Sequence, residues 1–391
     1  LLTPPGQTAS REHLHALLRA RHLPLPAEDA SHLSLDIGGV HLRWEQHTEF
    51  QTYTFWRSLP ERPTSFDEPA VSLVPQDWLR GIPGQWLVGT HMVVTRSRDD
   101  GSDPLIRGGL SEESLVGSIV MDGQAEVYTD FRLHPDGFAR VVVVAASMHP
   151  RRLGRTVQRL LEVETYRMMA LLGLPAARQV SSTLADAERE LAQIADQIRN
   201  AEGSHEPELL RQLTGLAGRV ESLYANTHAR FSASSAYFEL VQRRIDELAE
   251  HRLAGLQTMG EFMDRRLGPA MQTCAWAARR QQQLSERISR TSNLLRTRVE
   301  IEQQQSSQAL LDAMNRRQKA QLMLQTAVEG LSIAAITYYG AGLVGYLAKG
   351  AKNAGLPWNT DLVVAVAIPV IAFTVWLGMR RLHAAAQRAA E

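Results

Sequence analysis

The sequence predicts a mixed α+β or α/β domain, followed by a long helical stalk and two C-terminal transmembrane helices. Up to about Pro150, short apolar runs alternate with Gly and Pro, which is typical of strands and turns. From Arg152 onward, apolar residues recur every three or four positions, as on one face of a helix. Two stretches near the C-terminus, Ala327 to Ala348 and Leu362 to Met379, carry only one ionisable residue, Glu329. Each is about long enough to cross a bilayer, which takes roughly 20 apolar residues.

Composition excludes some classes of function. The 391 residues include 42 basic and 42 acidic side chains, so the formal net charge is +0. A general nucleic-acid-binding protein normally has a basic excess, and we therefore expect no nucleic-acid partner. The single cysteine, Cys274, can form neither an internal disulfide nor a metal site by itself.

Residues 1–150 form the predicted α/β domain. Its best strand signal is Glu45 to Trp56, which is rich in Thr and aromatic residues. Asp136-Gly137 predicts a hairpin turn before the last strand. The other predicted strands are Trp86 to Thr95, Ser114 to Met121 and Ala139 to Ser147, and the predicted helices are Arg11 to Arg21 and Pro75 to Leu79.

Residues 151–268 form a predicted helical region. The first helix is expected to end at Gly173 and Pro175. An amphipathic helix follows, and Glu206-Pro207 begins the next, with Pro and acidic residues in its first turn. These two helices predict an antiparallel hairpin, after which we expect another helix from Ala236 to Arg266.

Residues 269–325 are predicted to form one long stalk helix. No Pro or Gly occurs between Pro269 and Gly330, so the helix is expected to continue to about Ala348. At 1.5 Å per residue it would be roughly 120 Å long. Leu284, Ile288, Leu295 and Val299 follow coiled-coil spacing, which favours packing on other helices.

Residues 326–391 form the predicted two-span hairpin with a short basic tail. Three basic residues precede the first span and three follow the second, whereas the connecting loop holds only Lys349 and Lys352. The positive-inside rule then places the body and both termini in the cytoplasm. The basic residues outside the loop are Arg316, Arg317, Lys319, Arg380, Arg381 and Arg388.

Polar residues recur along the first span at intervals of seven, and they form one stripe on a coiled helix. One interpretation is that this stripe faces a pore or the axis of an oligomer. The other is that Tyr346 belongs to an interfacial aromatic belt and that the glycines pack the two helices together. Glu329 is either a functional intramembrane acid or an interfacial partner of Lys319 or Arg317. The stripe consists of Gln318, Gln325, Ser332, Tyr339 and Tyr346.

No enzyme motif is present, and we expect no catalytic residue and no bound cofactor, with an unidentified divalent cation as the alternative. The sequence lacks a P-loop, a dinucleotide-binding glycine motif, a zinc-protease motif and a nucleophile elbow. Alternate residues of the predicted strand would share one face: His47, Glu49, Gln51 and Tyr53. Such a row is more often the solvated or partner-facing side of a strand than a metal or acid–base site. Two charged clusters are expected to be solvated in preference to binding ions: Arg151, Arg152 and Arg155, and Asp99, Asp100 and Asp103.

Two segments are distinctive enough to carry a family resemblance. LRWEQHTEFQTYTFWR (Leu42 to Arg57) and TAVEGLSIAAITYYGAGLVGYLAKG (Thr326 to Gly350) resemble a bacterial family of uncharacterised membrane-anchored proteins, domain of unknown function 3422. The resemblance covers nearly the whole chain. It implies a bacterial inner-membrane location and no established activity.

A second resemblance concerns the architecture alone. The order of an α/β domain, a helical hairpin, a very long stalk helix and two C-terminal spans is similar to that of CorA-type magnesium transporters. Asn315-Arg316-Arg317 before the first span and Met379-Arg380-Arg381 after the second occupy similar places. This resemblance implies a funnel-shaped homopentamer with the first span around a central axis, and it suggests ion transport.

One departure limits what the second resemblance implies. CorA chains end the first span with Gly-Met-Asn, whereas this chain reads Gly345-Tyr346-Leu347 and contains no Gly-Met-Asn. The loop carries two lysines and only Asp361 as an acid, which does not favour a divalent cation. The prediction is therefore an oligomeric channel or transporter of unassigned ion. The alternative is a membrane-anchored scaffold or sensor that conducts nothing.

Overall fold

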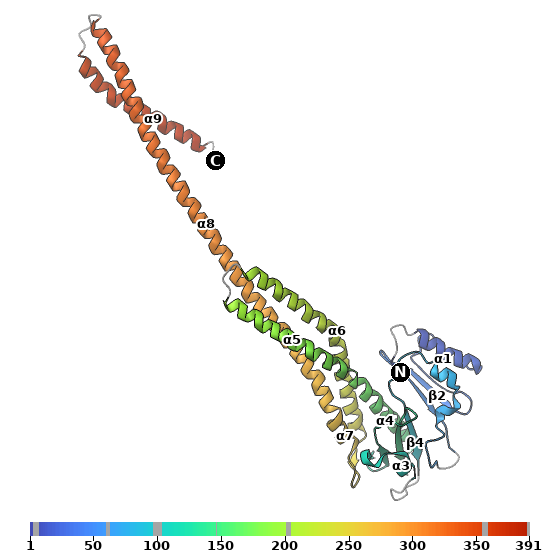
Figure 1. Cartoon of the computed structure of the whole chain (residues 1–391). Helices are drawn as coiled ribbons and strands as arrows, with labels where there is room; N and C mark the ends of the chain where they lie inside the picture. Colours follow the sequence, from blue (N-terminus) through green and yellow to red (C-terminus); the bar gives the residue numbers. More distant parts are fainter. Residues whose placement is uncertain are drawn as a thin grey trace. The chain divides into compact units, whose positions relative to one another are not determined.

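The structure is a computed structural model that describes residues 1–2, 8–59, 63–96, 104–145, 147–200, 205–353 and 359–388. Side chains are described in these ranges except at residues 8 and 382–388. Internal contacts divide the chain into two units, Leu1–Leu294 and Leu295–Glu391, and helix α8 (Gly268–Asn353) contributes residues to both. The first unit contains both sheets, and the second contains the two apolar C-terminal segments (Figure 1).

The first sheet is a small antiparallel meander in the order β1-β2-β3. Its strands are β1 (His32–Asp36), β2 (His41–Gln46) and β3 (Gln51–Trp56). One face is covered by α1 (Thr8–Ala20), which buries Leu14 and Leu18 against Leu42 and Trp44. The 3-10 helix η1 (Ala70–Leu73) and helix α2 (Gln76–Arg80) follow this sheet in the chain. The predicted helices in these two places are confirmed.

The predicted strand from Glu45 to Trp56 is in fact two strands. A tight turn separates β2 from β3, and the backbone N–H of His47 donates to the carbonyl of Phe50 across it at 2.8 Å. His47 and Glu49 therefore lie in the turn, while Gln51 and Tyr53 lie in β3. The expected row of four residues on one strand was wrong, because the polar residues at 47–49 serve the turn.

The second sheet has the order β4-β7-β6-β5-β8. Only β4 and β7 run parallel, and the other neighbours are antiparallel. Asp136 and Gly137 lie in a turn between β6 and β7, and Gly137 has a positive φ of 84°. Its strands are β4 (Thr90–Thr95), β5 (Val116–Val120), β6 (Ala125–Thr129), β7 (Ala139–Val144) and β8 (His251–Arg252).

Helices cover both faces of the second sheet. On one face, Val127 and Val143 pack with Leu160 of α4 and Met259 of α7. On the other face, Leu105 of α3 packs with Val142. The helices involved are α3 (Pro104–Gly109), α4 (Pro150–Leu171) and α7 (Met259–Arg266), and the 3-10 helix η2 (Glu112–Ser114) precedes β5.

Long helices α4, α5 (Gly173–Asn200), α6 (Glu206–Glu247) and the start of α8 lie side by side in the first unit (Figure 1). The first predicted helix ends as expected, since α4 stops at Leu171 and α5 begins at Gly173. Ion pairs of Arg219 with Glu190 and of Arg244 with Glu162 show that α6 runs antiparallel to α5 and α4. The predicted helical hairpin is thus present.

The predicted helix from Ala236 to Arg266 was wrong. Helix α6 ends at Glu247, β8 then joins the second sheet, and α7 begins at Met259. Leu253 and Leu256 pack against the sheet core instead of forming one face of a helix. Thr258 restarts the helix with a capping box shared with Glu261, which satisfies backbone N–H groups that a helix start leaves free.

Helix α8 confirms that one long continuous helix runs from Gly268 to Asn353, and its role as a stalk remains a prediction. It spans 86 residues, and its buried residues Cys274, Ala277, Leu284, Ile288 and Leu295 follow coiled-coil spacing. Helix α9 (Thr360–Arg388) follows it. Among the residues that the structure describes, two segments, within Met259–Asn353 and at Thr360–Arg381, are long and apolar enough to cross a membrane. The predicted boundaries at 150, 268 and 325 remain predictions.

Candidate functional site

The predicted stripe lies entirely on α8, and its members are wholly or partly exposed in the single chain. Tyr339 is 71% exposed and Tyr346 is 78% exposed, although both lie in the apolar segment. Gln325 and Gln318 are exposed and lie about half a turn and about two and a half turns before that segment, and Ser332 is half-buried. The structure thus places these side chains along one helix, and no other described element covers the two tyrosines.

Helix α9 packs on a different face of α8. A Cβ on Gly340 would lie 3.2 Å from Ile371, and one on Gly345 would lie 3.5 Å from Val364. Ala348, only 4% exposed, continues this face one turn further. With 3.6 residues per turn, Tyr339 and Tyr346 point about half a turn away from it. The glycines therefore provide the close helix contact, while the stripe points away from α9.

Ser332 and Tyr339 both make contacts within α8. The Ser332 hydroxyl donates to the carbonyl of Val328 at 2.9 Å, which leaves its oxygen free to accept. Tyr339 contacts Tyr338 edge to face at 5.6 Å. Half-buried Glu329 lies ten residues after Lys319 on the same helix, or about 15 Å along its axis. Glu329 is therefore too far from Lys319, and further still from Arg317, to pair with either within one chain.

A second polar site connects the first sheet to the helices of the same unit. We call it the turn junction: His47, Glu49, Phe50, Tyr166 and Tyr237. Phe50 is 3% exposed, stacks on His47 at 4.2 Å, and meets both tyrosines edge-on. The Tyr237 hydroxyl donates to Glu49 at 3.3 Å, and Arg230 of α6 also pairs with Glu49.

Burial dominates the ionisation of the turn junction. It raises the pKa of Tyr237 to about 12, with Glu49 adding to the effect. Burial also raises the pKa of Tyr166, and it lowers the pKa of His47 against the opposing effect of Glu45 and Glu162. Both tyrosines are thus protonated donors at neutral pH, and His47 favours its neutral form. The junction can hold the turn that joins β2 and β3 in place against α4 and α6. It holds no free nucleophile.

The sequence analysis missed most of this junction. His47 and Glu49 were considered, but their partners Tyr166, Arg230 and Tyr237 lie more than 100 positions later. Nothing in the local pattern of α4 or α6 marks these residues as partners of a turn. Only the docking of β2 and β3 on the two helices brings them together.

Of the two charged clusters, the structure describes only the basic one. Arg151, Arg152 and Arg155 lie in the first turns of α4, where Arg152 pairs with Asp122 at 3.2 Å. The segment 97–103, with Asp99, Asp100 and Asp103, lies outside the described residues. Within the described ranges, no group of three or more His, Cys, Asp or Glu residues is placed to hold a metal ion.

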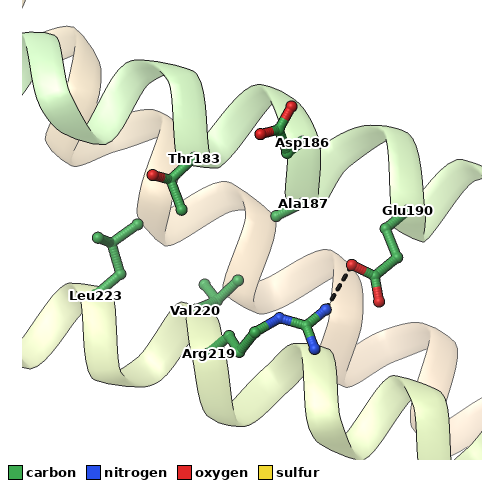
Figure 2. A pocket seen from close by; sticks show the side chains of 7 residues that line it. All are labelled: Thr183, Asp186, Ala187, Glu190, Arg219, Val220 and Leu223. Atoms are coloured by element: carbon green, nitrogen blue, oxygen red, sulfur yellow. Dashed lines mark hydrogen bonds and ion pairs between the residues drawn. The ribbon is translucent and has the colours of Figure 1, made fainter.

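A shallow hollow of about 110 Å³ lies between α5 and α6 (Figure 2). Its floor is apolar, formed by Ala187, Val220 and Leu223, and the ion pair of Arg219 with Glu190 crosses one end. Thr183 and Asp186 complete its rim. It carries no unpaired buried acid or base, so its geometry is that of an ordinary groove between two packed helices.

Fold and site together define a class: a mixed α+β protein with long helices and two C-terminal helices able to cross a membrane. The chain belongs to the family described as "Protein of unknown function (DUF3422)", whose model matches residues 1–386. The predicted family membership is therefore confirmed. No curated protein and no solved structure shows significant similarity to the chain.

Proposed function

We propose that this chain is an integral protein of the bacterial inner membrane that assembles into a homo-oligomer around its first span. Helix α8 lies around a shared axis, α9 lies outside it, and ions pass along the polar stripe. The body and both termini lie in the cytoplasm, in accord with the basic residues beside the two spans. A pentamer is favoured by the architectural resemblance to CorA-type transporters.

One observation carries this proposal: the stripe points away from α9, which is the only described element that packs on the apolar part of α8. Gly340 and Gly345 face α9, whereas Tyr339 and Tyr346 are more than two-thirds exposed. Hydrocarbon offers no hydrogen-bond partner to a hydroxyl or an amide, so polar groups in spans normally face other helices or water.

A second copy of the same stripe is a chemically suitable partner. Gln, Ser and Tyr side chains both donate and accept hydrogen bonds, so identical residues can pair around a symmetry axis. A stripe repeating every seven residues stays in contact along a left-handed coiled arrangement of parallel helices. These properties support an axis lined by α8, and they assign no ion and no cofactor.

The alternative is a scaffold or sensor that conducts nothing. It is favoured by the size of the stripe residues, because Tyr339 and Tyr346 of every copy would place their aromatic rings on the axis and plug it. The absence of Gly-Met-Asn and the two lysines of the loop also argue against a magnesium pathway. Neither version requires an enzymatic activity.

Reconstitution into liposomes distinguishes the two. The transport proposal predicts cation flux above that of empty vesicles, changed by substituting Ser332 or Tyr339. An intact oligomer that passes no monovalent or divalent cation would overturn it and leave the scaffold. A monomer in detergent would remove the axis and with it both versions.

A further inference from the structure

The register between α8 and α9 aligns the charged residues at the ends of the two apolar segments. Two contacts fix it: Gly340 with Ile371, and Gly345 with Val364. We count residues along both helices from the midpoint of these contacts. At one end of the pair, Lys349 then lies at the same height along the helix axes as Asp361. At the other end, the same register brings Glu329 level with Arg381.

The charges also lie on matching flanks. With 3.6 residues per turn, Glu329 and Lys349 sit about a quarter turn to either side of the glycine face of α8. Arg381 and Asp361 sit about a quarter turn or less to either side of the α9 face that carries Val364 and Ile371. When two helices pack antiparallel, residues displaced in the same rotational sense from the two contact faces lie on the same side of the pair. Glu329 therefore lies on the same side as Arg381, and Lys349 lies on the same side as Asp361.

The spacing matches the thickness of a bilayer. Glu329 precedes Lys349 by twenty residues, and Asp361 precedes Arg381 by twenty residues. Twenty helical residues measure about 30 Å, which is the thickness of the hydrocarbon core. No charged residue lies between Glu329 and Lys349, and only Arg380 lies between the other two.

We propose that Glu329 pairs with Arg381, and Lys349 with Asp361, and that these two pairs mark the borders of the hydrocarbon. A charge at such a border is costly alone and less so beside an opposite charge. The inference rests on the proposed membrane insertion and deepens it. It places Ser332, Tyr339 and Tyr346 inside the hydrocarbon, and it places Gln318 and Gln325 outside. The absence of charge alone would set the border nearer Lys319, because the uncharged stretch begins directly after that residue.

Charge reversal in the full chain tests the pairing. Glu329→Arg and Arg381→Glu should each reduce the amount of folded protein recovered from the membrane fraction, and the double reversal should restore it. The control is Glu329→Arg with Arg380→Glu, since the Arg380 guanidinium lies over Trp376 of its own helix at 5.0 Å. No recovery in the Glu329/Arg381 double variant, or equal recovery in the control, would overturn the pairing.

Cysteine labelling tests the border independently. In a Cys274→Ser background, Gln325→Cys should react with a membrane-impermeant maleimide added to inside-out membrane vesicles, and the lipid-side control Leu331→Cys should not. Equal labelling of both positions, or labelling of neither, would overturn the border at Glu329. Loss of the unmutated chain from the membrane fraction would instead contradict the proposed membrane function itself, so the two failures are distinguishable.

Discussion

At the scale of single residues, buried polar side chains are held by partners far away in the sequence. Gln51 has no exposed surface, and its amide donates to Ser10 at 3.0 Å and to the Pro83 carbonyl at 2.9 Å. The Trp44 indole donates to the same side chain. Because unpaired buried polar groups cost free energy, such residues fix the positions of the elements around them.

His91 should make stability depend on pH. It is 9% exposed and stacks on Phe138 at 4.0 Å, and burial lowers its pKa against the opposing effect of Asp136. The unfolded chain therefore binds the proton first as the pH falls. The stabilisation is fully present above about pH 6.5 and is lost as the pH falls through the folded value.

The measurement is the thermal midpoint of the full chain in detergent at about pH 7.5 and about pH 5.5. His91→Phe keeps the aromatic stack and should shrink the difference between the two midpoints. His41→Phe, at an exposed histidine that stacks on Trp56, is the matched control. An unchanged difference in His91→Phe would contradict the assignment.

Glu250 should stabilise the start of α7. Its carboxylate accepts from the Ser118 hydroxyl at 2.8 Å and from the backbone N–H groups of Met259 and Gly260 at 3.1 and 2.8 Å. Glu250→Gln replaces one acceptor oxygen by a donor and should lower the free energy of unfolding by about 1–2 kcal/mol. Chemical denaturation measures this loss, and Glu239→Gln at an exposed site of α6 should have little effect.

At the scale of elements, the same apolar spacing produced different structures in different contexts. Leu248, Leu253 and Leu256 have helical spacing, yet they lie at the end of α6 and around β8. The sheet offers Leu253 and Leu256 an apolar surface, and β5 offers β8 a hydrogen-bonding edge. Periodicity alone could not show that an edge strand was available to residues 251–252.

The contact between α8 and α9 gives a prediction at this scale. Gly340→Leu should separate the two helices, because a Cβ added at this position would lie only 3.2 Å from Ile371. Gly342→Leu is the matched control, since nothing lies within 4 Å of the Cβ position there. We expect a lower thermal midpoint in detergent for the first variant only. Equal midpoints would show that α9 does not pack on Gly340.

At the scale of the whole molecule, the α8 stripe should control assembly. Replacing Tyr339 and Tyr346 together by Leu keeps the span apolar and removes two hydroxyls from the proposed axis. We expect the oligomer to dissociate more readily in detergent, as measured by light scattering or native mass spectrometry. Tyr338→Leu is the control, because Tyr338 lies about a quarter turn or more from the stripe. Dissociation in the control alone would place the axis on another face.

The sequence by itself determined the order of the structural elements along the chain. Hydrophobic patterning gave the mixed domain, the long helix α8 and the two apolar segments, because period and length are local properties of the chain. Two distinctive segments of the sequence, Leu42 to Arg57 and Thr326 to Gly350, also indicated the family. The tertiary structure decided what depends on contacts between distant residues: the turn at His47, the addition of β8 to the second sheet, and the face of α8 that meets α9. That last contact separates the glycine face from the stripe, and no pattern within a single helix could show which face its neighbour would cover.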